Sequence, residues 1–141
     1  MIRVVVLVLA LLAAGCAPLG YPVRTLQYVQ QERAGHGLAP LEWDNSLVPV
    51  VAERARGFAL ARRVDHGGIE GAVASSPAAD RYVCELMGGQ PLWEVERSVG
   101  VGLLASPPHR ACIDDPRYTR ATIAAVVGAD GWVYEVLWLT D

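Results

Sequence analysis

The segment SPPHRACIDDP, residues 106–116, brings a histidine, a cysteine and two aspartates together. The whole chain has only three histidines and three cysteines, so their meeting here raises the question of a site. Prolines restrict the backbone, and Pro107 and Pro108 therefore predict a rigid corner that can hold the imidazole of His109 in one place. The alternative is that His109 fills a turn and has no chemical role.

Ser106 lies three residues before His109, so a serine hydrolase is the first chemistry to test. A serine nucleophile needs a base, and that base needs an acidic group to orient it. The sequence contains no G-x-S-x-G motif, and it offers no evident acidic partner for the histidine. We therefore do not assign Ser106 as a nucleophile.

The composition of the chain limits the classes of protein to which it can belong. The length of 141 residues fits one domain, and a hydrophobic content of 52% is enough for a real core. The formal net charge is −3, with no clustered run of basic residues. A nucleic-acid-binding face needs such a cluster, so we expect no nucleic-acid partner.

Residues 1–15 have the pattern of a secretory signal. Arg3 supplies a positive start, and the apolar run of residues 4–14 is too short to span a membrane. It ends in LAAGC, which resembles the bacterial lipobox, although Ala13 stands where leucine is commonest. We expect export, lipidation of Cys16, a tether over residues 16–24 and anchoring to the outer face of a bacterial membrane. The alternative is an ordinary cleaved signal with a chance cysteine.

Two further cysteines, Cys84 and Cys112, remain for the folded domain. Export would place them where disulfides persist, so the simplest expectation is that they pair with each other. A metal site that uses both thiolates is the alternative, but neither cysteine belongs to a C-x-x-C pair.

The order of elements predicts an α+β layered domain that ends in a β-hairpin. In the second helix, Arg54 belongs to the charged face that we expect to point to solvent, and Ser46 is the expected cap. The pattern predicts helices at 25–34, 46–63 and 91–105, a loop at 65–80, a strand at 81–89, and a hairpin of 121–127 with 132–139.

Three stretches in order, GLAPLEWDNSL, CELMGG and SPPHRACI, resemble the CAP superfamily, also called the SCP domain. This group includes cysteine-rich secretory proteins and plant pathogenesis-related proteins, and the match is closest to its short bacterial branch. The resemblance covers residues 25–141. It implies a three-layer α-β-α sandwich with a cleft.

By the same resemblance, His66, Glu85 and His109 line that cleft, and Ser106 occupies the place of a further glutamate in eukaryotic members. Some members hold a divalent metal there. Two histidines and a glutamate suit zinc with an open position, or acid–base chemistry. The resemblance also brings Cys84 and Cys112 near one another, which favours a disulfide. This chain departs from the family pattern at Gln30, Cys84, Leu86 and Leu103.

Three functions fit these sequence features. The first is a non-enzymatic surface lipoprotein whose cleft binds an apolar or cell-envelope ligand, since some branches of the family are reported to bind sterols or fatty acids. The alternative is a metal-dependent hydrolase that uses His66, Glu85 and His109. The third is a structural or adhesive module, which a cleft filled by side chains would favour.

Overall fold

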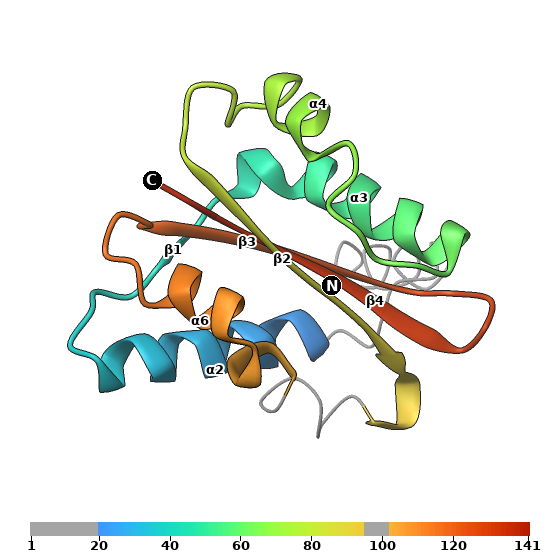
Figure 1. Cartoon of the computed structure of the whole chain (residues 1–141), viewed down its shortest axis with the longest axis horizontal. Coiled ribbons are helices and arrows are strands. Elements are labelled where there is room, and N and C mark those ends of the chain that lie inside the picture. The colour runs from blue at the N-terminus through green and yellow to red at the C-terminus, as the bar shows by residue number, and fades with distance from the viewer. Residues whose placement is uncertain (1–19, 95–101) are drawn as a thin grey trace, which may run out of the picture.

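The computed structural model describes residues 20–94 and 102–141, and it shows three layers (Figure 1). The central sheet has the strand order β1-β3-β4-β2. The strand β1 is parallel to β3, and the other pairs are antiparallel. The strands are β1 (Glu42–Trp43), β2 (Val83–Pro91), β3 (Arg120–Val127) and β4 (Trp132–Thr140).

Helices cover both faces of the sheet (Figure 1). One face carries α3 (Val48–Ala61) and the short α4 (Ile69–Ala74), and the other carries α2 (Tyr21–Gly35) and α6 (Pro107–Ile113). Short 3₁₀ turns, η1 (Asn45–Leu47) and η2 (Leu92–Glu94), precede α3 and follow β2. The predicted α+β sandwich with its terminal hairpin is therefore confirmed.

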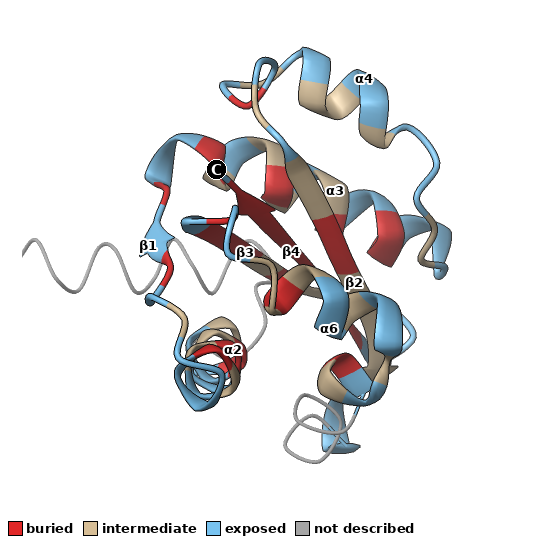
Figure 2. Cartoon of the chain, turned by 60° about the vertical axis from the view of Figure 1, so that its left-hand side comes forward, coloured by how far each residue is buried: buried red, intermediate tan, exposed pale blue. Residues whose placement is uncertain are grey.

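The sheet separates two apolar cores, because successive side chains of a strand point to opposite faces. In β4, Val136 and Trp138 pack against α3, whereas Leu137 and Leu139 pack against α2 and α6. Both sets are almost fully buried, and the outer faces of the helices are exposed (Figure 2). Because both of its faces are buried, the sequence of β4 is almost continuously apolar and does not alternate between apolar and polar residues.

Several local expectations need correction. The predicted loop at 65–80 contains α4, and α2 begins at Tyr21, inside the stretch that we expected to be a tether. The predicted corner at the two prolines is the first turn of α6, where proline is welcome because its missing N–H needs no partner. Asp44, not Ser46, caps the turn before α3 by accepting the Ser46 backbone N–H at 2.9 Å.

The prediction that a helix begins at Pro91 is also wrong. The strand β2 does not stop at its glycine pair but continues to Pro91, and η2 follows it. A Cβ atom at Gly89 would lie 3.3 Å from the Tyr134 ring, so glycine lets the strand pass close to that aromatic side chain. Residues 95–101 of the expected helix lie outside the described residues.

Two polar side chains of α2 fasten this helix to the rest of the fold. The amide of Gln30, which stands where the family pattern has asparagine, bonds both the N–H and the carbonyl of Leu41. The buried guanidinium of Arg33 donates to four backbone carbonyls at 2.7–3.2 Å. Those carbonyls belong to Ala39, Ile113, Asp115 and Tyr118.

A buried acid lies beneath the start of α2. Glu135 of β4 is only 1% exposed, and its polar neighbours are the hydroxyls of Tyr21 and Thr25. Burial raises the pKa of Glu135 to about 7, although the two hydroxyls act in the opposite direction. The folded state therefore holds this proton more tightly than the unfolded chain does.

We expect the stability of the fold to depend on pH through Glu135. Because its pKa is raised on folding, the contribution is fully present below about pH 4.5 and is lost as the pH rises through 7. Between pH 5 and pH 8, the free energy of unfolding of the wild type should fall by roughly 2–3 kcal/mol more than that of the Glu135→Gln variant. Urea denaturation at both pH values measures this difference. The exposed Glu70→Gln is the control, and an equal fall in both variants would contradict the assignment.

Candidate functional site

The edge strand β2 carries the central acid of the site. The Glu85 side chain is 2% exposed and points toward α3. Arg54 of α3 binds it through two nitrogens, with Nε donating to Oε2 at 2.8 Å and Nη2 to Oε1 at 2.5 Å. The indole Nε1 of Trp138 also donates to Oε2, at 2.9 Å. Both carboxylate oxygens therefore already have strong partners.

Arg54 corrects the expectation that its side chain points to solvent. The side chain is 11% exposed, and its guanidinium lies over the Phe58 ring at 5.0 Å. A buried carboxylate needs an opposite charge, and the helix supplies one from the position that faces Glu85. Sequence reasoning could have found this partner only from the presence of a glutamate inside an apolar strand.

His66 lies in the loop after α3, and Arg54 also helps to hold that loop. Nη1 of Arg54 donates to the carbonyl of Gly67 at 2.8 Å. The imidazole Nδ1 of His66 lies 3.4 Å from Glu85 Oε1, and its side chain is 63% exposed. One arginine therefore positions both the acid and the loop that carries the first histidine.

His109 lies on α6, in the layer across the sheet from α3. Its Nδ1 is buried without a hydrogen bond of normal geometry. Burial lowers the pKa of His109, the positive charge of His66 lowers it further, and a contact with the Leu103 backbone opposes both. The imidazole is therefore held toward its neutral form, and the two histidines lie close enough to influence each other.

The remaining predicted positions lie around this group. Ser106 is the N-cap residue of α6, but its hydroxyl forms no capping bond. Leu86 and Leu103, two of the departures from the family pattern, are buried in the core between the sheet and α2 and α6. They fill the interior rather than the mouth of the site.

A disulfide joins the two elements that carry Glu85 and His109. Cys84 of β2 and Cys112 of α6 are bonded, with their Cα atoms 6.3 Å apart. This confirms the predicted pairing and rules out a metal site that uses both thiolates. The bond fixes α6 against the edge strand beside the site.

A groove opens between α3 and α4, next to the buried ion pair. Its volume is about 470 Å³, and it shares Arg54 and Gly67 with the site. Most of its other lining residues are small or apolar, and Glu53 and Ser75 add polar groups at its border. The apolar part is formed by Val50, Gly57, Phe58, Gly71 and Ala72.

His66, Glu85 and His109 do not converge as a metal site. Among residues 20–94 and 102–141, their ligand atoms do not form a group within 4.8 Å of one another. Glu85 would also have to leave Arg54 before it could bind a cation. The arrangement does not fit a resident zinc ion.

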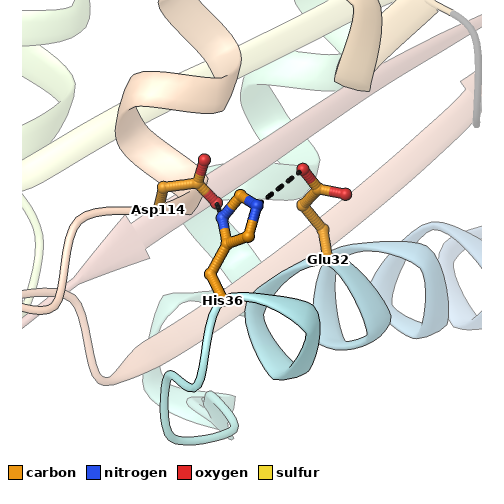
Figure 3. A group of neighbouring side chains, drawn as sticks. All are labelled: Glu32, His36 and Asp114. Carbon is orange, nitrogen blue, oxygen red and sulfur yellow. Dashed lines mark ion pairs between the residues drawn. The ribbon is translucent and has the colours of Figure 1, made fainter.

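Glu32, His36 and Asp114 do converge, at the junction of α2 and α6 (Figure 3). His36 Nδ1 lies 2.9 Å from Asp114 Oδ1, and Nε2 lies 3.8 Å from Glu32 Oε1. Arg110 of α6 occupies the same Glu32 oxygen at 2.7 Å. Sequence patterns did not reveal this group, although the spacing of Glu32 and His36 places them on one helix face. The ion pair of Arg110 with Glu32 and the contact of His36 with Asp114 link the ends of α2 and α6.

The fold and site together define an α-β-α sandwich with polar residues at an edge strand. Residues 26–140 match the family model described as the cysteine-rich secretory protein family. The chain therefore belongs to the CAP superfamily. No curated protein sequence matches it.

Solved structures of bacterial proteins share this fold. An outer surface protein of Borrelia burgdorferi superposes with a TM-score of 0.68 at 17% identity, over 82% of this chain and 88% of that one. An extracellular SCP-domain protein of Bacillus anthracis gives 0.67 at 18% identity, over 85% of this chain. A cysteine-rich secretory protein of Staphylococcus aureus gives 0.64 at 13% identity, over 86%. This chain spans 40% of the length of each of the latter two.

No helix within residues 20–94 and 102–141 is long and apolar enough to cross a membrane.

Proposed function

We propose that this CAP protein is an exported, lipid-anchored binder of an apolar or cell-envelope ligand, and that the groove between α3 and α4 holds the ligand. The observation that carries this proposal is the groove itself. Its volume of about 470 Å³ and its mostly apolar lining are typical of small-molecule sites, which use a few polar groups for orientation. Arg54 and Ser75 supply such groups at its border.

The state of Glu85 supports binding over catalysis. A general base or a metal ligand needs a carboxylate oxygen that is free to accept a proton or a cation. Both oxygens of Glu85 are taken by Arg54 and Trp138 instead. The carboxylate therefore acts as a structural counter-charge that fixes the wall of the groove.

Three observations support export and anchoring. The LAAGC pattern ends at Cys16, the disulfide suits an oxidising compartment, and the structural neighbours are named as outer-surface, extracellular or secretory proteins. A diacylglyceryl anchor has two chains, which is enough for stable retention. The Cys16→Ser variant should therefore move from the membrane fraction to the soluble fraction, or remain unprocessed. An unchanged membrane signal of processed Cys16→Ser protein would refute the anchor.

Ligand binding is tested by filling the groove. Gly57 lies within α3 and has open space around it, so Gly57→Leu should occupy the groove without distorting the helix. We expect the wild type to bind cis-parinaric acid with a rise in its fluorescence, and Gly57→Leu to bind it at least tenfold more weakly. Gly35→Leu, at the end of α2 and also in open space, is the control. Equal binding by all three proteins, or no binding by the wild type, would overturn the assignment.

The metal-dependent hydrolase is the less favoured alternative, because the ligand atoms of His66, Glu85 and His109 do not form a group within 4.8 Å of one another. Purification without chelator distinguishes the two functions. One zinc per chain that is lost in the His66→Ala/His109→Ala variant would favour the hydrolase. Metal-free wild-type protein that binds the apolar probe would favour the ligand binder.

A further inference from the structure

The exposed large apolar side chains are unevenly distributed. Eight such residues are found in the described chain, and five of them lie at the end of the molecule that holds the β3–β4 turn. Solitary exposed apolar residues are ordinary, but a group at one end of a molecule marks an interaction surface. We call this group the hairpin-end surface, and it consists of Val23, Leu60, Leu92, Trp93 and Trp132.

Contacts between elements bring these five residues to the same end. The register pairs Pro91 with Trp132, and the Leu92 N–H donates to the Gly131 carbonyl at 3.1 Å, so η2 lies beside the hairpin turn. Leu60, at the last turn of α3, lines a hollow of about 360 Å³ with residues 126–129 of the hairpin. Figure 1 shows the turn, η2 and the end of α3 on its right-hand side.

The first turn of α2 belongs to this end as well. Tyr21 packs against Val133 and, beside it, Val127, the residues that flank the hairpin turn. Val23, two residues further along, is 56% exposed. The point where the described chain begins is therefore at the same end as the exposed tryptophans.

The length of chain before α2 limits how far this end can be from a lipid anchor. Only four residues separate Cys16 from Tyr21. Five residue steps of fully extended chain span at most about 17 Å. A domain tethered this closely must keep its α2 end near the headgroups.

We propose that the hairpin-end surface docks onto the phospholipid bilayer that carries the lipid anchor. This inference rests on the proposed lipidation of Cys16. Trp93, 78% exposed, and Trp132 have the amphipathic rings that concentrate at membrane interfaces, and Leu60, 86% exposed, adds an aliphatic contact. Arg62 is exposed next to Leu60, and its charge is balanced by the nearby Asp130 of the hairpin turn, so the apolar side chains carry the docking.

Docking in this way would orient the site. Glu85 lies six positions before Pro91 on β2, which corresponds to roughly 20 Å along the strand. The ligand groove between α3 and α4 would then be held open to the surroundings. The surface would thus fix the height and direction of the ligand groove rather than bind the ligand.

Quenching of tryptophan fluorescence by brominated lipids tests the proposal. The mature protein is purified from membranes and incorporated into vesicles of brominated phosphatidylcholine and phosphatidylglycerol. Two of the four tryptophans lie on the hairpin-end surface, so we expect loss of roughly half of the fluorescence. Trp93→Phe/Trp132→Phe should show little quenching, because Trp43 pairs with Ala121 at the opposite end of β3 and Trp138 is buried.

A second variant weakens docking without removing the reporters. Val23→Glu/Leu60→Glu keeps all four tryptophans and should reduce the quenching severalfold. The matched control is Tyr82→Glu, an exposed aromatic residue at the far end of β2, which should leave the quenching unchanged. Equal quenching in the double glutamate variant and the wild type, or no quenching in the wild type, would overturn the proposal.

Failure of the anchor and failure of docking give different results. The mass of the mature protein shows directly whether Cys16 carries a lipid. If it carries none, its thiol is coupled to a maleimide lipid in the same vesicles, since the other two cysteines are already bonded to each other. The quenching result then decides docking by the same criteria, whatever the origin of the anchor.

Discussion

Replacing Arg54 by methionine is expected to lower the free energy of unfolding by about 3–5 kcal/mol. The change leaves the carboxylate of Glu85 buried with the Trp138 indole as its hydrogen-bond donor and the exposed imidazole of His66 3.4 Å away. An uncompensated buried charge costs far more than the net value of the ion pair itself, which is why the single variant should be so damaging. Urea denaturation monitored by circular dichroism measures the loss.

A double variant separates the cost of the unpaired charge from other effects of the methionine. The Arg54→Met/Glu85→Gln variant contains neither the buried carboxylate nor its arginine partner. It should therefore recover most of the stability that Arg54→Met alone loses. Arg56→Met is the matched control on the same helix, because its pair with Glu53 is exposed and should contribute under about 1 kcal/mol. The assignment fails if Arg54→Met costs no more than this control, or if the double variant is no more stable than the single one.

Arg33→Met is expected to cost about 4 kcal/mol or more. The guanidinium donates to four backbone carbonyls, and methionine would remove these bonds, although the Asp115 carbonyl keeps the Tyr118 N–H at 3.4 Å. Each buried acceptor left without a partner costs about 1–3 kcal/mol, although some of them can relax toward water. Such a loss is a large part of the stability of a small domain, so thermal unfolding followed by circular dichroism should show a much lower midpoint.

Two further variants test whether geometry or charge is responsible. Arg33→Lys keeps the charge but cannot present the planar fork, so it should be only partly better than methionine. Arg63→Met removes an exposed arginine that pairs with Asp65 and should change little. A thermal midpoint for Arg33→Met close to that of Arg63→Met would contradict the structural role.

Sequence patterns predicted the long elements and missed the short ones. The apolar stripe of α3 and the two runs joined by GADG carry strong periodic signals, and both form as expected. The six residues of α4 are too few to show a period, and Gly71 inside them has low helix propensity. A glycine pair often ends a strand, but β2 continues here because its pairing with β4 runs on to Pro91 and Trp132.

The sequence predicted which residues belong to the site, but it did not predict how their side chains are paired. The family resemblance placed His66, Glu85 and His109 together, and it also favoured the disulfide that the structure confirms. Nothing local to Arg54 could reveal its role, because its partner lies 31 residues away on another element. The group of Glu32, His36 and Asp114 likewise depends on the packing of α6 against α2, which sequence spacing does not specify.

The bonds of Arg33 also have a consequence for the order in which the chain folds. Its acceptors at Ile113 and Tyr118 lie 80 and 85 residues further along the chain, and β1 pairs with β3 over a similar separation. Such distant contacts form late, because the entropy of a long loop must be overcome before they stabilise anything. We therefore expect the β3–β4 hairpin, which is local, to form early and the N-terminal helix to be fixed last. Fragments that lack the final third of the chain should then leave α2 undocked, however well its own sequence favours a helix.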